Sequence, residues 1–86
     1  MNIQEISEEI SGLNSQMLKL FIRRLELTNE AGKLRMAEGK PLYDRKTEEK
    51  IIQEVVESTP QDMQNYSIEF FRSLIKLSKE YYNDNR

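Results

Sequence analysis

The chain has 86 residues, enough for one small domain, and we expect a single domain over residues 1–86. It is 37% hydrophobic and 33% charged with only three Gly and two Pro, a composition that favours long helices over a turn-rich β fold. Cysteine and histidine are absent, which excludes disulfides, thiolate nucleophiles, imidazole bases and the common zinc sites. The net charge of −2 argues against a nucleic-acid partner.

The distribution of charged and apolar residues bears on location and on ligands. No apolar run approaches the ~20 residues of a membrane span, and the start of the chain, residues 1–5, lacks the basic residues of a signal peptide. We therefore expect a soluble, cytoplasmic protein without a membrane partner. Basic residues outnumber acidic ones between Lys19 and Lys50, whereas residues 1–18 contain Glu but no Lys or Arg. The middle of the chain is the place to look for an anion site.

The first predicted helix runs from about Ile3 to Glu38 and ends before Gly39. Such a helix is on the order of 50 Å long, whereas a compact domain of this size is roughly 30 Å across, so we expect a second chain to cover the overhang. A plain two-stranded coiled coil is the alternative, but the apolar surface broadens between Met17 and Leu25, more than a two-helix seam needs. The apolar stripe itself consists of Ile3, Ile6, Ile10, Leu13, Met17, Leu20, Leu27, Ala31 and Leu34.

Two shorter helices are predicted after a connector at residues 39–43. Asp44 is suited to cap the first of them, a short helix. Thr59, Pro60 and Asp62 predict the cap, the first helical residue and the acidic residue that open a third helix of medium length. The sequence thus predicts an all-α fold of three helices. The apolar residues of the second helix are Ile51, Ile52, Val55 and Val56, and the buried face expected for the third is Met63, Tyr66, Phe70, Leu74, Leu77 and Tyr81.

Two arginines of the long helix do not fit a purely structural interpretation. The heptad frame places Arg24 in the seam, where an unpaired guanidinium is costly to bury. Arg35 lies eleven residues later, about three turns and roughly 20° away, so both side chains can point into one cavity and bind a dicarboxylate. The alternative is that Arg24 pairs with an internal Glu while Arg35 lies in solvent. Glu48 can equally be a solvated charge, and Ser78 a neutral filler.

Taken in order, these residues resemble the all-helical type II chorismate mutases. Arg24 and Arg35 match the family's arginine and the basic residue eleven positions later. Residues 39–44 and then Glu48 are similar to the family's connector, which ends in its aspartate, Asp44, and to its substrate-hydroxyl glutamate. Ser78 falls on the serine of the family's last active-site helix. The resemblance spans nearly the whole chain and implies an intertwined homodimer.

The resemblance also implies an activity, the conversion of chorismate, a small dicarboxylate, to prephenate in the shikimate pathway of aromatic amino-acid biosynthesis. This unimolecular rearrangement needs no nucleophile, metal or cofactor. By the family's pattern, Arg24 clamps a carboxylate and Glu48 holds the substrate hydroxyl. Arg35 stands where a lysine usually serves a carboxylate and the ether oxygen, whose developing charge must be stabilised.

Three positions depart from the family's pattern. Ser7 stands where an arginine reaches into the partner subunit's site, and Thr47 stands where another arginine is typical. Tyr82 replaces the glutamine that donates to the ether oxygen, although a phenol can still donate one hydrogen bond. Loss of two arginine contacts is expected to cost on the order of 3–6 kcal/mol in the transition state, about a hundred- to ten-thousandfold in rate.

These departures keep several alternatives open beside a weak chorismate mutase. One is a non-catalytic module of the same fold that regulates or binds a partner and retains an anion pocket. Another is a mutase that depends on a partner enzyme of the shikimate pathway. A third is a relative of isochorismate pyruvate-lyase, which no residue of this chain favours.

Overall fold

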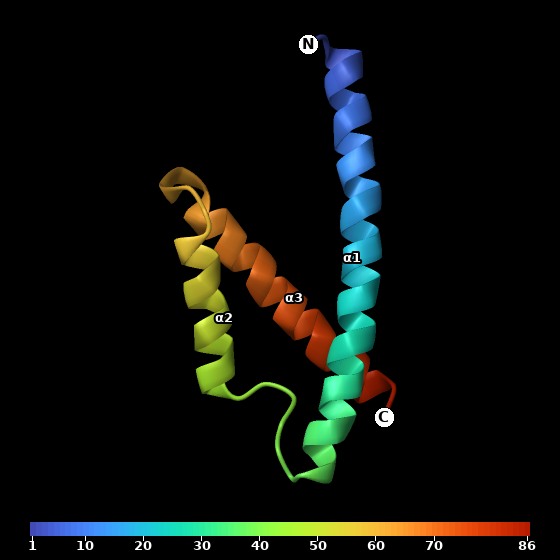
Figure 1. Ribbon diagram of the computed structural model, residues 1–86, viewed down its shortest axis with the longest axis vertical. Coiled ribbons are helices and arrows are strands. Elements are labelled where there is room, and N and C mark those ends of the chain that lie inside the picture. The colour runs from blue at the N-terminus through green and yellow to red at the C-terminus, as the bar shows by residue number, and fades with distance from the viewer.

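The computed structural model describes all of residues 1–86 and consists of helices joined by short connections (Figure 1). Helix α1 covers Ile3–Ala37, helix α2 covers Arg45–Glu57, and helix α3 covers Gln64–Asp84, preceded by a 3₁₀ turn at Gln61–Met63. The predicted all-α class, with one long, one short and one medium helix, is confirmed. None of the three helices is long and apolar enough to cross a membrane.

Local sequence explains where α1 begins and ends. The side chain of Asn2 accepts a hydrogen bond from the backbone N–H of Glu5 at 2.9 Å and so caps the first turn. At the other end, Gly39 has a φ of 73°, a conformation that glycine adopts without strain. The backbone N–H of Gly39 donates to the Met36 carbonyl at 2.9 Å, and the helix ends within one residue of the predicted position.

The cap predicted for α2 is confirmed, and the one predicted for α3 is wrong. Asp44 accepts from the backbone N–H of Thr47 at 2.7 Å, which fixes the start of α2. Thr59 instead donates its hydroxyl to the Val55 carbonyl at 2.7 Å and so completes the last turn of α2. Pro60 has an extended ψ of 144°, and α3 begins only at Gln64. Thr59 could have accepted from an N–H of the following helix, but its side chain donates to a free carbonyl of the preceding one, and neither the 3₁₀ turn nor α3 has a side-chain cap.

Helix α3 crosses behind the C-terminal half of α1 and packs against α2 on its other side (Figure 1). Its buried face consists of Leu74, Ile75, Ser78 and Tyr82. Val55 of α2 and Leu42 of the connector complete the small core. The core therefore lies around the middle and end of α3, beside the part of α1 that carries Arg24 and Arg35.

The face predicted to be buried on α3 is wrong for the single chain, with the exception of Leu74. Successive helical residues are 100° apart, so the observed face lies next to the predicted one, and α3 is apolar over about half of its circumference. One part of this arc meets α1 and α2, and the other is left uncovered. The exposed members of the predicted face are Met63, Tyr66, Phe70, Leu77 and Tyr81.

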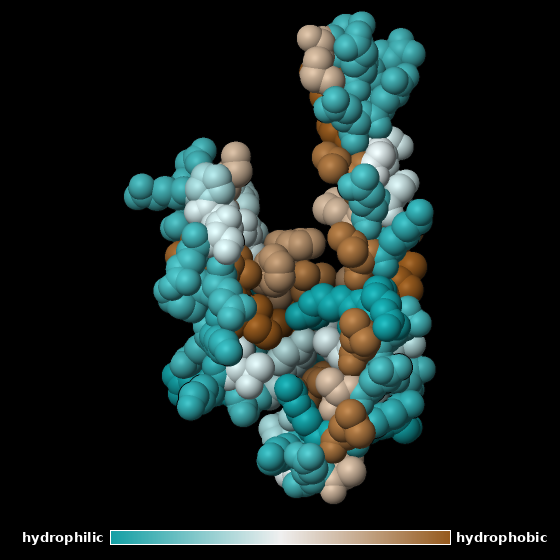
Figure 2. All heavy atoms as spheres, in the orientation of Figure 1, coloured by the Kyte–Doolittle hydropathy of each residue, from teal (hydrophilic) through white to brown (hydrophobic).

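The N-terminal half of α1 projects from the rest of the molecule, and every residue from 1 to 20 is exposed (Figure 1). The radius of gyration is 15.8 Å, against ~12 Å for a compact chain of this length. The accessible surface is 7003 Å², whereas a compact 10.2 kDa monomer exposes roughly 5300 Å². Figure 2 shows apolar surface along α1 on the side that faces α2, and over α3 at the bottom of the hollow between them.

Candidate active site

Arg24 reaches across from α1 to α3 and to the connector. Its guanidinium donates to the Ser78 hydroxyl at 2.7 Å and to the Tyr43 hydroxyl at 3.1 Å. Ser78 is only 1% exposed, and its hydroxyl donates a hydrogen bond to the Leu74 carbonyl at 2.8 Å. Arg24 is half-buried and forms no ion pair, so a full positive charge is held against neutral hydroxyls. This excludes the alternative in which Arg24 pairs with an internal Glu.

Arg35 is also half-buried, three turns further along the same face of α1. Its guanidinium donates to the carbonyl of Leu42, the residue next to Tyr43. The two arginines therefore converge on residues 42–43 of the connector. Neither arginine has a carboxylate within hydrogen-bonding distance. The alternative in which Arg35 lies in solvent is excluded as well.

Asp44 follows this segment and is exposed at the N-terminus of α2. The pKa of its carboxyl is lowered, chiefly because the backbone N–H and the side chain of Thr47 donate hydrogen bonds to the ionised form. The charges of Arg35 and Lys46 lower this pKa further. In the single chain Asp44 thus caps α2, and its negative charge interacts electrostatically with Arg35.

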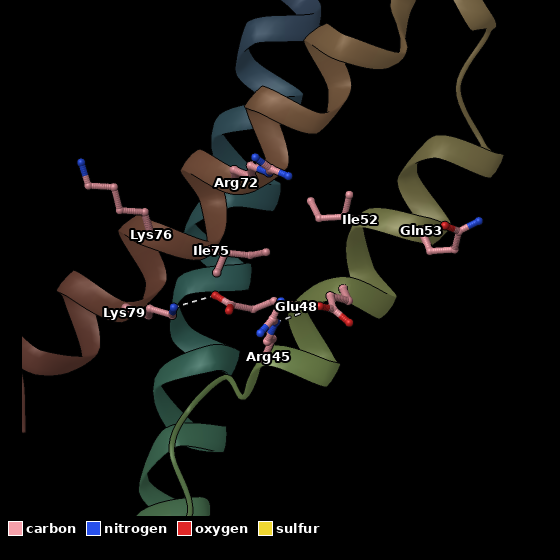
Figure 3. Close-up of a pocket in the computed structure, with 9 residues that line it drawn as sticks. Arg45, Glu48, Ile52, Gln53, Arg72, Ile75, Lys76 and Lys79 are labelled. Carbon is pink, nitrogen blue, oxygen red and sulfur yellow. Dashed lines mark hydrogen bonds and ion pairs between the residues drawn. The ribbon is translucent and has the colours of Figure 1, made fainter.

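Glu48 lies one turn into α2 and turns toward α3. Its carboxylate accepts from the ammonium of Lys79 at 2.6 Å, a bond that joins the two helices (Figure 3). The pair lies at one end of a groove of about 570 Å³ between α2 and α3, in which Ile52 and Ile75 face one another. Lys79 directly follows Ser78, so Glu48 is tied to the same turn of α3 that holds Arg24.

Tyr82 is buried against α1 one turn beyond Ser78, with 6% of its surface exposed. Its ring lies on Gly32, where a Cβ atom would come within 2.6 Å of Cδ1 and 3.1 Å of Cγ. Only a residue without a side chain allows the ring to lie this close to the helix. The bulky side chain at this position therefore packs as part of the α1–α3 interface.

The two positions at which the resemblance leads one to expect arginines differ in how near they lie to this cluster. Ser7 is exposed in the projecting half of α1, about 25 Å along the helix axis from Arg24. Thr47 is half-buried in the first turn of α2, where its backbone N–H donates to Asp44. Of the residues singled out in the sequence, the structure thus brings together Arg24, Ser78 and Tyr82 on the α1–α3 contact, with Arg35, Asp44 and Glu48 around the connector and α2. Ser7 lies outside the site of its own chain.

Three residues of this cluster had escaped the sequence analysis. Tyr43 was assigned only to the connector, Lys79 resembled any exposed lysine of a charged helix, and Gly32 was merely a glycine inside a helix. Gly32 could have been recognised from the sequence, because a glycine inside a helix weakens that helix and often marks a place where another part of the chain packs close to its backbone. The roles of Tyr43 and Lys79 depend on hydrogen bonds to Arg24 and Glu48, which lie 19 and 31 residues away in the chain, and helical periodicity does not encode such contacts.

Comparison with known proteins shows to which family the chain belongs. The family model described as chorismate mutase type II matches residues 6–83, nearly the whole chain. The chain belongs to the type II chorismate mutase family. No curated protein and no solved structure matches it. The three-helix arrangement agrees with the all-α fold of this family, and the match includes every residue of the cluster described above.

Proposed function

We propose that this chain is a chorismate mutase that converts chorismate to prephenate in aromatic amino-acid biosynthesis, and that it acts in the cytoplasm as a homodimer. The observation that carries the proposal is the state of Arg24. Its half-buried guanidinium is oriented by Ser78 and Tyr43, and no carboxylate neutralises it. A charge held in this way is ready to bind an anion, because exchange of a hydroxyl for a carboxylate adds a charge-assisted hydrogen bond.

The catalytic contribution of these residues is orientation and electrostatic stabilisation. Arg24 and Arg35 would hold the two carboxylates of chorismate in the folded conformation from which it rearranges, which removes much of the entropic part of the barrier. Arg35 would also donate toward the ether oxygen as negative charge develops there. Glu48 would accept a hydrogen bond from the substrate hydroxyl. None of these roles needs proton transfer to a side chain.

Dimer formation is supported by the surface that a single chain leaves uncovered. The accessible surface exceeds that of a compact monomer by roughly 1700 Å², and two chains that each buried this area would form an interface of the size typical of obligate homodimers. The exposed apolar residues of α1 and α3 would supply its core. Ser7, in the projecting half of α1, would then lie near the site of the partner chain.

The test is a direct assay for prephenate with the purified chain, alone and with candidate partner enzymes of the pathway. Light scattering at micromolar concentration on the same sample should give about twice 10.2 kDa. A folded monomer would refute the dimer, and absence of prephenate in every mixture would refute the mutase.

A second candidate is a non-catalytic module of the same family that binds an anion or a partner protein. The buried ring of Tyr82 favours it, because this ring fills the space beside Gly32 where the family has a flexible glutamine. The exposed Ser7 and the half-buried Thr47 supply no charge in place of the missing arginines. A folded dimer that binds prephenate without forming it from chorismate would establish this second function.

A further inference from the structure

The proposed site has a shortage of positive charge. Chorismate carries two carboxylates, and the site must offset both on binding. Arg24 and Arg35 supply two positive charges, and the carboxylates of Asp44 and Glu48 lie nearby at the start of α2. No carboxylate pairs with either arginine, but the formal charges of these four residues sum to zero. A dianion would then enter a site with no net charge, and burying charged groups without compensation is unfavourable.

Lys79 is the further cation that the structure holds at this site. Its ammonium lies 2.6 Å from the Glu48 carboxylate, and its side chain is 43% exposed, so it remains accessible to a ligand. It follows Ser78, the residue that bonds Arg24. Three other cations line the α2–α3 groove and are placed differently. Arg45 pairs with Glu49 in its own helix, and the side chain of Lys76 points away from α2 (Figure 3). Arg72 lies seven residues before Lys79 on α3, about two turns away from Ser78 and Glu48.

We propose that Lys79 is a substrate-binding residue that supplies the positive charge missing at Ser7 and Thr47, an inference that rests on the proposed mutase function. An ammonium has three N–H donors, and Glu48 accepts one of them. The other two are free to donate to a carboxylate of the substrate. In the same position Lys79 fixes the Glu48 carboxylate, which can then accept from the substrate hydroxyl.

A purely structural role for the pair predicts a different pattern of effects. Ion pairs this exposed contribute little to folding stability. If Lys79 only joined α2 to α3, its replacement would change thermal stability slightly and leave the response of catalysis to salt unchanged. If it binds substrate, its charge attracts the dianion, and loss of that charge lowers both affinity and salt dependence.

The deciding variant is Lys79→Gln, which can still donate to Glu48 but carries no charge. Steady-state kinetics of prephenate formation and calorimetric titration with prephenate would be measured at low and high salt. We expect kcat/KM and prephenate affinity to fall by roughly ten- to a hundredfold at low salt and less at high salt. Lys79→Arg should retain most of the activity because it keeps the charge.

Lys76→Gln is the matched control, since Lys76 lies on the same helix, borders the same groove and pairs only with Glu80 at 3.9 Å. It should behave as the wild type. Circular dichroism checks folding, and Lys79→Met is the second neutral variant should Lys79→Gln not fold. An active wild type with an equally active Lys79→Gln overturns this inference alone. A wild type that neither forms nor binds prephenate overturns the proposed function and this inference with it.

Discussion

Gly32→Ala tests whether the ring of Tyr82 is packed tightly between α1 and α3. The new Cβ would lie 2.6 Å from Cδ1 and 3.1 Å from Cγ of Tyr82, and Cγ is too near the backbone to move away freely. Overpacking of this kind costs typically 1–3 kcal/mol, and the gain from alanine in a helix offsets about 1 kcal/mol of it. We expect the free energy of unfolding to fall by up to about 2 kcal/mol, measured by urea unfolding followed by circular dichroism at one fixed protein concentration.

The background variant Tyr82→Gln removes the ring. In this background Gly32→Ala should stabilise the protein by up to about 1 kcal/mol, which gives a coupling energy of about 1–3 kcal/mol between the two positions. Gly12→Ala is the control, because a Cβ at Gly12 meets no atom within 4 Å and should stabilise α1 in both backgrounds. Equal effects of Gly32→Ala with and without the Tyr82 ring would refute the close packing.

Two other predictions concern acid stability and missing charge. Because the pKa of Asp44 is lowered on folding, its stabilising contribution is present above the ordinary carboxyl pKa and is lost as the pH falls through the lowered value. Asp44→Asn should therefore keep the cap and flatten acid unfolding monitored by circular dichroism, whereas Asp44→Ala should lose stability even near neutral pH; an unchanged acid profile in Asp44→Asn would contradict the assignment. Ser7→Arg should raise kcat/KM roughly ten- to a hundredfold, and Thr47→Arg should add an increment that is less than additive, since both would orient one dianion. Steady-state kinetics of both single variants and of the double variant would check this, and no increase in any of them would mean that missing charge does not limit the rate.

Much of the fold could be predicted because residues close together in the sequence determine where the helices begin and end. The apolar stripe and Gly39 gave the extent of α1 to within one residue, and Asp44 gave the start of α2. The start of α3 was missed because the Thr59 side chain can either accept from an N–H of the following helix or donate to a carbonyl of the preceding one, and the sequence does not rank these two roles. The side of α3 that packs was missed because α3 is apolar over two adjacent faces, and only the position of α1 and α2 decides between them.

The site was partly predictable for a similar reason. Arg24 and Arg35 stood out because charged residues at these positions conflict with the apolar stripe, and the structure accounts for both through neutral partners on the connector and α3. Their partner Tyr43, the pairing of Glu48 with Lys79, and the contact of Gly32 with Tyr82 all join elements distant in the chain. No spacing rule relates these residues, so they become visible only once the helices are packed.

The most direct test of the central claim compares prephenate formation by the wild type with that by Arg24→Met at the same protein concentration. The wild type should form prephenate from chorismate faster than the uncatalysed reaction. Arg24→Met should lose at least about a hundredfold in kcat/KM, because it removes the charge-assisted contacts of a guanidinium that has no counter-charge in the protein. A wild-type rate equal to the uncatalysed rate, or an Arg24→Met variant as active as the wild type, would contradict the account.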